Sequence, residues 1–297
     1  MKWENRLINT HESVKKQAET LNKLGLFSNT IESNETITKP TITLYGSNKK
    51  HWYSHEIIKK AENANAIISF DNHTDAYSGE LNMETHIYHT LKTHPEMKGI
   101  LYGYSAMRGI NSEIKTRIIG IEAYQQKRTE KLLNAVKKLN EQIAITIDLD
   151  VLVSTPYERT SEATTDYSEQ QLAPEVMAIT LDELLTAIKI VTNNKKVISV
   201  DICGHKETNN IDNRTILSIA SIIHQLEKNE TLNYNKIMDL IRGYEPGVFN
   251  KEEYRSVYKH ENEFNSVYEI IKPARTLDEV KQRLDKKIYK QPKRKDN

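Results

Sequence analysis

The chain has 297 residues, of which 37% are hydrophobic and 28% charged, and its 42 Lys and Arg against 41 Asp and Glu give a formal net charge of +1. This balance argues against nucleic acid as the main partner, because proteins that bind nucleic acid usually carry a basic excess. No apolar run approaches the roughly 18 residues that a membrane span needs, and the first residues lack the apolar core of a secretion signal. The single cysteine, Cys203, allows no internal disulfide. We therefore expect a cytoplasmic protein.

The chain divides into three regions that differ in composition. Residues 1–39 are polar, with one amphipathic helix expected over 11–25. Residues 40–228 alternate short apolar runs with helical patterns. Residues 229–297 are charged and dotted with tyrosines at helical spacing, which predicts two or three amphipathic helices as an extension, and they end in a basic tail that we expect to be solvated.

The middle region predicts an α/β domain. Its apolar runs are continuous and rich in Ile, Val and Tyr, as in strands that are covered on both faces. We expect strands over 41–46, 66–70, 99–104, 117–123, 144–152 and 197–202, and helices over 52–62, 82–93, 128–140, 180–192 and 214–228. Thr180 and Glu183 form a capping box at the start of one of these helices. This alternation indicates a three-layer α/β/α domain with a mostly parallel sheet, whose strands end at one common edge.

Acidic residues and a histidine follow two of these strands. Asp71, His73 and Asp75 come directly after the run AIISF, and Asp148 and Asp150 follow the run AITI. Side chains at alternate positions past a strand can converge on one point, and ligands bind at this edge of open α/β sheets.

A divalent metal cluster is the interpretation that we favour for these residues. Four carboxylates at the ends of buried strands are costly without compensating positive charge, and neither segment contains Lys or Arg. An acidic pair after a strand is more often a helix cap or part of a turn. Two such groups after two apolar strands are harder to explain by turns alone.

These segments resemble the signatures of the ureohydrolases, the family of arginase, agmatinase and formimidoylglutamase. DNHTD is similar to that family's DAHxD segment, and TIDLD to its later SxDxD segment. The order of the other elements over residues 40–228, including Arg108 in SAMRG, resembles the family as well. The resemblance implies an arginase-like fold with two divalent metal ions, and carboxylate and imidazole ligands without thiolate favour Mn²⁺.

The resemblance also implies a role for each candidate ligand. Asp71 and Asp148 would bridge both ions, with His73 and Asp150 completing one site and Asp75 the other. The family's remaining ligand lies in a GGDHS segment, in place of which this chain has YGSNKKHWYSHE. His51 is the first candidate for that ligand and His55, one helical turn further, is the fallback, and both could instead sit at the exposed start of a helix.

The expected chemistry is hydrolysis of a carbon–nitrogen bond. A hydroxide that bridges two divalent ions would attack the sp² carbon of a linear guanidino, amidino or amide compound. Asp75 would hold the remaining proton. His86 occupies the region where some family members keep a proton-shuttling histidine, although it could be, like His89, an ordinary residue of the 82–93 helix.

The substrate-binding half of the family pattern is altered. The family has a glutamate that grips the guanidinium group three residues after the Asp of the last core strand, and counting from Asp201 this position is Gly204. We expect Gly204 to leave room for a bulkier or neutral group that His205 could contact, and Glu207 to replace the missing carboxylate only if the loop takes another path. Val153 and Ser154 stand where the family has Asp-Pro.

Two other functions remain open at this stage. The chain could be a catalytically silent relative that keeps the fold and binds a metal or a partner. It could also be a deacetylase of the histone-deacetylase type, but that type needs a pair of adjacent histidines and no HH dipeptide occurs here. In the favoured interpretation the partner is a small-molecule substrate, neither a membrane nor nucleic acid, and the chain could form a homo-oligomer as ureohydrolases commonly do.

Overall fold

The computed structural model describes residues 3–23, 25–27, 36–104, 109–123, 125–139, 142–152, 179–204 and 213–228. Several expectations lie outside these residues, namely the helices and basic tail of 229–297, Arg108, Val153 and Ser154, and His205 and Glu207. Among the described helices, none combines the length and the apolar character that crossing a membrane requires.

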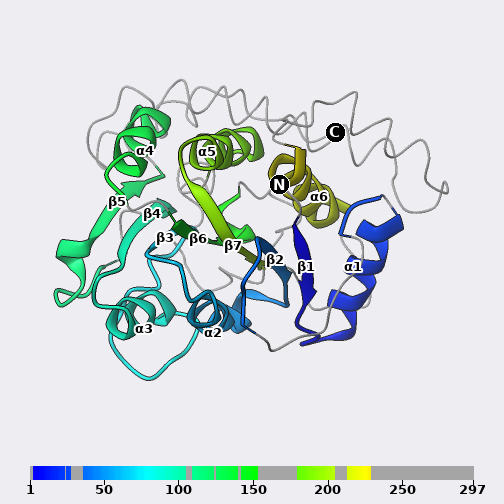
Figure 1. Cartoon of the computed structure of the whole chain (residues 1–297), viewed down its shortest axis with the longest axis horizontal. Helices are drawn as coiled ribbons and strands as arrows, with labels where there is room; N and C mark the ends of the chain where they lie inside the picture. The colour runs from blue at the N-terminus through cyan, green and yellow to red at the C-terminus, as the bar shows by residue number, and fades with distance from the viewer. Residues whose placement is uncertain are drawn as a thin grey trace, which may run out of the picture.

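Seven parallel strands form one sheet in the order β1-β2-β7-β6-β3-β4-β5 (Figure 1). The strands are β1 Glu4–Leu7, β2 Thr41–Leu44, β3 Ala66–Phe70, β4 Lys98–Tyr104, β5 Ile118–Glu122, β6 Gln142–Asp148 and β7 Lys196–Cys203. From β3 the chain moves outward to β4 and β5 and returns on the other side of β3 with β6. The carboxyl ends of β3 and β6 therefore flank the point where the strand order reverses, which is where open α/β sheets bind ligands.

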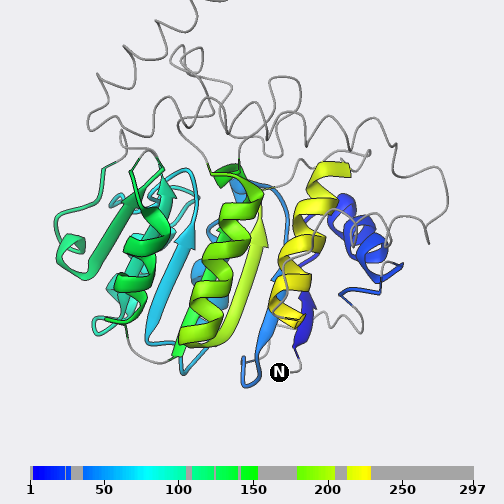
Figure 2. The ribbon, with the colours of Figure 1, turned by 90° about the horizontal axis from the view of Figure 1, so that it is seen from above.

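Helices cover both faces of the sheet and make the three-layer α/β/α arrangement predicted from the sequence. They are α1 Glu12–Lys23, α2 Tyr53–Lys60, α3 His86–Thr93, α4 Arg128–Val136, α5 Leu181–Asn194 and α6 Asn213–Lys228, with short 3₁₀ turns η1 Asn48–Lys50, η2 Lys115–Arg117 and η3 Leu149–Val151. The helices α4, α5 and α6 lie side by side on one face, with α1 next to α6, while α2 and α3 cover the other face (Figures 1 and 2).

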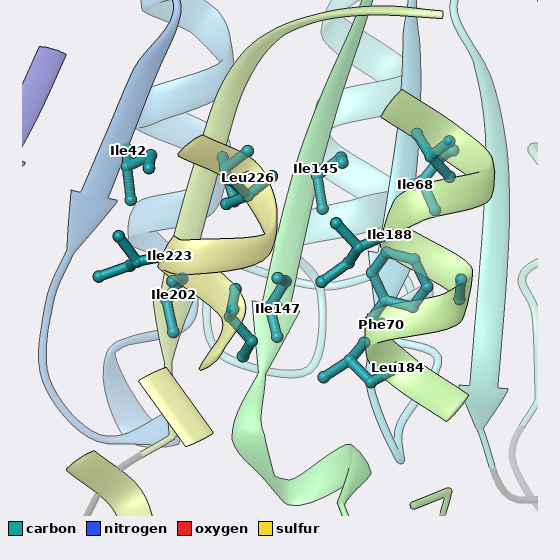
Figure 3. Close-up of a cluster of buried hydrophobic side chains, with 14 of the residues drawn as sticks. Ile42, Ile68, Phe70, Ile145, Ile147, Leu184, Ile188, Ile202, Ile223 and Leu226 are labelled. Carbon is teal, nitrogen blue, oxygen red and sulfur yellow. The ribbon is translucent and has the colours of Figure 1, made fainter. Parts of the chain in front are cut away.

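The core follows from strands that are apolar on both faces. Ile68 and Phe70 of β3 face α4, α5 and α6 and join the large cluster shown in Figure 3, which includes Ile145, Ile147 and Ile188. The neighbouring residue of β3, Ile67, belongs to a second cluster with Ile87 and Leu91 of α3. Because successive strand residues alternate between faces, the polar residues on the Ile67 side of the sheet face α2 and α3.

All six expected strands are confirmed, with shifts at their ends that have local causes. The strand expected over 144–152 ends at Asp148, because the Asp148 carboxylate accepts a hydrogen bond from the Asp150 amide and turns the chain into η3. The helix expected over 82–93 begins only at His86, since Thr85 holds the preceding residues in a turn through Glu80 and Asn82. The helix expected over 128–140 ends at Val136.

Two features differ from the sequence expectations. The polar segment 1–39 supplies a strand, β1, as well as the expected helix, and its Asn5 and Arg6 are buried where β1 pairs with β2. Only one of the two hydrogen bonds of the capping box at α5 forms. The Thr180 hydroxyl accepts the Glu183 amide at 3.1 Å, but the Glu183 carboxylate binds Arg128 of α4 instead of the Thr180 amide.

Candidate metal centre

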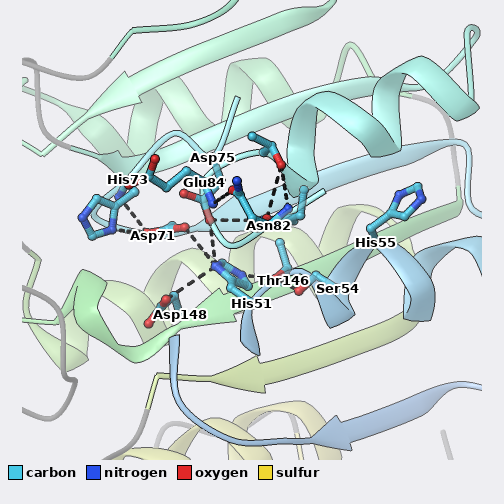
Figure 4. A network of polar contacts seen from close by, with 12 residues as sticks. His51, Ser54, His55, Asp71, His73, Asp75, Asn82, Glu84, Thr146 and Asp148 are labelled. Atoms are coloured by element: carbon cyan, nitrogen blue, oxygen red, sulfur yellow. Dashed lines mark hydrogen bonds and ion pairs between the residues drawn. The ribbon is translucent and has the colours of Figure 1, made fainter. Parts of the chain in front are cut away.

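Four aspartates meet at the carboxyl ends of β3 and β6, on the face covered by α2 and α3, and Figure 4 labels Asp71, Asp75 and Asp148 among them. Asp71 follows β3, Asp148 ends β6, and Asp150 lies in η3. Asp75 lies in the loop before α3 with a φ of +45°, and its carbonyl accepts the amides of Ile87 and Tyr88 at 3.0 and 3.3 Å. All four side chains are buried, so the two segments identified in the sequence do converge.

Three of these carboxylates share one arrangement. In each, one oxygen accepts a backbone amide: Asp71 Oδ1 from His73 at 2.6 Å, Asp148 Oδ1 from Asp150 at 3.1 Å, and Asp150 Oδ1 from Asn72 at 3.1 Å. The other oxygen faces a histidine ring. The backbone therefore fixes each carboxylate while leaving one oxygen directed into the centre.

His51 lies at the middle of the first group of ligands. Its Nδ1 is 2.9 Å from Asp75 Oδ2, 3.4 Å from Asp71 Oδ2 and 3.5 Å from Asp148 Oδ2. His51, the first candidate from the sequence, thus lies among the carboxylates. His55 lies one helical turn away and contacts Thr90 instead, at 3.2 Å (Figure 4).

His73 forms the second group with Asp150 and Asp71. Its Nδ1 lies 2.9 Å from Asp150 Oδ2 and 3.4 Å from Asp71 Oδ1. Although burial opposes the shift, the Asp150 carboxylate raises the pKa of His73 to about 12. Asp71 contacts both histidines, one through each oxygen, as the bridging role implied by the resemblance requires.

His86, the first residue of α3, also belongs to the centre. Its ring is fully buried, Nδ1 lies 3.0 Å from Asp75 Oδ2, and the ring centroid is 4.0 Å from that of His51. Burial, together with the charge of His51, lowers the pKa of His86 to about 4. An ordinary position on the helix surface, which the sequence left open for His86, does not describe this residue.

A buried hydroxyl network supports His51 from behind, and sequence reasoning missed it. His51 Nε2 lies 3.0 Å from Thr146 Oγ1, and Thr146 donates to Asp201 Oδ1 at 2.9 Å. Ser54 and Tyr45 donate to the same oxygen at 2.6 and 3.0 Å. Thr146 lies two residues before Asp148, so strand alternation could have placed both on one face.

The donor set fits divalent cations. Among the described residues, the ion-pair partners of the four aspartates are the histidines His51, His73 and His86. Within that part of the chain, Asp71 Oδ2 and Asp150 Oδ2 are buried and receive no hydrogen bond of good geometry. Burial raises the pKa of Asp148 to about 7. The four buried carboxylates outnumber the three histidines that face them, so a cation would compensate the remaining charge, and oxygen and imidazole donors suit Mn²⁺ or a similar ion. The Cys203 thiol also has its sulfur within 4.8 Å of ligand atoms of His51 and Asp148.

The structure corrects the expectation for Gly204. From the sequence we expected that Gly204, which has no side chain, leaves room for the substrate. In the structure other atoms fill this space. A Cβ on Gly204 would overlap Asp148 Oδ1 and lie 2.7 Å from the Leu149 amide nitrogen. Gly204 has a φ of +90° and donates its amide to Gly46 at 3.1 Å. Glycine is needed here so that β7 can approach the Asp148 carboxylate.

Comparisons with known proteins identify the fold. No family model matches the sequence, and no curated protein matches it. Among solved structures, arginase from Bacillus subtilis has 11% identity and a TM-score of 0.52, and arginase from Bacillus cereus has 12% identity and a TM-score of 0.51; each match covers 78% of this chain and 100% of the other. The agmatine ureohydrolase of Thermoplasma volcanium matches at 14% identity, over 71% of this chain and 67% of that one, with a TM-score of 0.46. The all-parallel seven-stranded sheet and the likeness to the two Bacillus arginases show that this chain has the arginase fold.

Proposed function

We propose that this chain is a metal-dependent hydrolase that cleaves a carbon–nitrogen bond in a linear guanidino, amidino or amide compound. The observation that carries the proposal is the convergence of four buried aspartates and two histidines, His51 and His73, in two groups that share Asp71. The arginase fold supports the reaction class by analogy, because the site lies at the same sheet edge where such folds bind ligands.

The ligands divide between two divalent ions, for which Mn²⁺ is our first choice. His51, Asp75, Asp71 and Asp148 would hold one ion, and His73 and Asp150, with Asp71 and Asp148, the other. When bound, a pair of divalent ions supplies a water whose pKa is low enough to be ionised near neutral pH.

The residues of the chain then have separable tasks. The backbone amides that hold Asp71, Asp148 and Asp150 fix the carboxylates before any ligand arrives. Asp75 stays ionised at the centre: although burial opposes the shift, the neighbouring His51 and His86 rings lower its pKa. As the resemblance to the ureohydrolases implies, Asp75 would hold the proton that the attacking water loses and pass it to the leaving nitrogen.

A catalytically silent metal-binding protein is the second candidate, and Gly204 is the observation that favours it. The position that bears the guanidinium-gripping carboxylate in the ureohydrolase pattern has no side chain and no room for one. A substrate would have to be bound by other residues, for which His205 and Glu207 remain proposals.

The hydrolase and the silent metal-binding protein would both bind metal, but only the hydrolase would turn over a substrate. We expect the purified protein to contain two divalent ions and to release ammonia or urea from a compound in a panel of guanidines, amidines and amides. Asp71→Ala and Asp148→Ala should each remove the bound metal, while Asp182→Ala, at an exposed position on α5, should keep it. Unchanged metal content in either of the first two variants would refute the centre, and full metal content without turnover would favour the silent protein.

A further inference from the structure

One buried side chain of the centre has no ligand role in the proposed function. His86 comes from α3, and its imidazole ring lies 4.0 Å from that of His51, centroid to centroid, with a tilt of 43°. Three elements far apart in sequence, the turn before α2, the loop after β3 and the start of α3, thus bring His51, Asp75 and His86 together.

The polar atoms of His86 are poorly satisfied. Its ring is fully buried, and among the described residues Nδ1 makes no hydrogen bond of good geometry although it lies 3.0 Å from Asp75 Oδ2. His51 and His55, which are also buried, each have a ring nitrogen against a threonine hydroxyl. A buried nitrogen without a partner is destabilising, so the position of His86 needs another explanation than packing.

The distances around Asp75 match those of ligands that share an ion. Asp75 Oδ2 lies 2.9 Å from His51 Nδ1 and 3.0 Å from His86 Nδ1, and one ligand atom from each of the three residues lies within 4.8 Å of the others. Two ligands bound at about 2.1 Å and at right angles to each other are roughly 3.0 Å apart. Asp71 Oδ2, buried and without a hydrogen bond among the described residues, faces the same nitrogen of His51 at 3.4 Å.

We infer that His86 is a direct ligand, through Nδ1, of the ion that His51 and Asp75 hold. This inference rests on the proposed function and adds to it. The first ion would then have two imidazole ligands and the second, at His73, one, so the two ions would differ in ligand set. A ligand role also replaces the proton-carrying role expected for His86 from the sequence, because the nitrogen that faces Asp75 would be bound to the ion.

The alternative is a positioning role, in which His86 only orients the Asp75 carboxylate. Loss of activity or of metal affinity in a His86 variant would not separate these roles, since removing His86 disturbs Asp75 in both cases. A direct bond between a ring nitrogen and the ion does separate them, because it gives a one-bond spin coupling when the ion is ¹¹³Cd²⁺ and the nitrogen is ¹⁵N.

The experiment uses the full chain with ¹⁵N-labelled histidine rings, loaded with ¹¹³Cd²⁺. Cys203→Ser serves as the parent protein, because the Cys203 thiol, the only one of the chain, lies within 4.8 Å of ligand atoms of His51 and Asp148 and cadmium would otherwise prefer it. Of the ten histidines, we expect three to show a coupling to cadmium. His86→Gln should lose one of the three, and His55→Gln, the matched change at a buried histidine outside the centre, should lose none.

Each outcome has one meaning. Three couplings, one of which disappears in His86→Gln, support the inference. Two couplings in the parent, or three that all survive in His86→Gln, overturn it and leave the metal centre standing. No coupling at any histidine overturns the metal centre itself and the inference with it. If His86→Gln fails to fold, the parent still decides, because assignment of its coupled rings shows whether His86 is one of them.

Discussion

At the scale of single residues, the centre depends on how closely the chain approaches the aspartates. Gly204 is the clearest case, because it lies at the end of β7 with its missing side chain directed at Asp148. What looked in the sequence like a lost substrate contact is, in the structure, a steric requirement of the Asp148 carboxylate. A residue with a Cβ at this position has to move either β7 or the Asp148 carboxylate.

Gly204→Ala should therefore harm both stability and metal binding. We expect a loss of about 3 kcal/mol in the free energy of unfolding, about 1 kcal/mol of it from a positive φ and the rest from displaced atoms. Urea denaturation of the metal-free protein measures the stability, and elemental analysis measures the metal content.

Gly25→Ala is the matched control for this change. Gly25 also has a positive φ, +74°, but nothing lies within 4 Å of its would-be Cβ. It should lose only about 1 kcal/mol and keep its metal. Equal losses in the two variants would mean that the crowding against Asp148 has no energetic effect.

Sequence reasoning reached part of the centre and missed the rest for identifiable reasons. Asp71, Asp75 and Asp148 were predicted because acidic residues past apolar strands are conspicuous along the chain. Thr146 was not predicted, since a threonine inside a strand has an ordinary structural explanation. Sequence reasoning ranked His51 before His55 only as a first choice, because one turn of the backbone separates them and no local pattern fixes which one faces the aspartates.

At the scale of elements, apolar runs predicted the central strands well because these are buried on both faces. The strand β1 was missed for the opposite reason: ENRL has one apolar residue in four, and its burial comes from the contacts of Asn5 and Arg6 with the rest of the fold. Glu183 shows a related effect, since its local capping signal was overridden by Arg128, which lies 55 residues away.

The contact between α4, α5 and β4 rests on a mostly buried charged group. Glu183 of α5 accepts two bonds from Arg128 of α4, at 2.6 and 2.5 Å, and one from the Tyr102 hydroxyl of β4 at 2.7 Å. The side chains of Arg128 and Glu183 are only 3% and 16% exposed, so water screens this ion pair little.

Glu183→Gln should destabilise the fold by about 3 kcal/mol, because it leaves the buried guanidinium without its counter-charge. Tyr102→Phe removes one hydrogen bond and should cost about 1 kcal/mol. Glu113→Gln is the same chemical change in an exposed pair with Lys92, where water screens the charges, and it should leave the unfolding midpoint unchanged. Chemical denaturation of the three variants checks this order, and equal midpoints for the two Glu→Gln variants would contradict it.

At the scale of the whole molecule, the fold holds a group of negative charge at the reversal point of its sheet. Because burial raises the pKa of Asp148 to about 7, the folded state binds this proton more tightly than the unfolded chain, whose ordinary Asp pKa is 3.8. The stability that this proton contributes is present below pH 3.8 and is lost as the pH rises toward 7. The buried Asp148 carboxylate therefore lowers the free energy of unfolding of the metal-free protein most at neutral and alkaline pH.

Metal binding should act in the opposite direction, because the ligands must be deprotonated to bind. His73, with its pKa raised to about 12, and Asp148 hold protons in the metal-free protein near pH 7 and must release them to the solvent. The apparent affinity should therefore rise about tenfold per pH unit for each proton released. Calorimetry of Mn²⁺ binding in two buffers with different enthalpies of ionisation counts these protons.

The two effects together predict how metal changes thermal stability. At a free Mn²⁺ concentration of 100 times the dissociation constant, binding stabilises the folded state by about 2.7 kcal/mol, which for a chain of this size raises the melting temperature by roughly 5 to 10 °C. At a fixed Mn²⁺ concentration this rise should grow from pH 6 to pH 8, since the metal-free state weakens while binding strengthens. Melting curves with and without Mn²⁺ at both pH values test it, with Asp71→Ala as the variant that should show no rise. A rise that is equal at both pH values, or larger at pH 6, would mean that the buried aspartates and His73 are not what the metal binds.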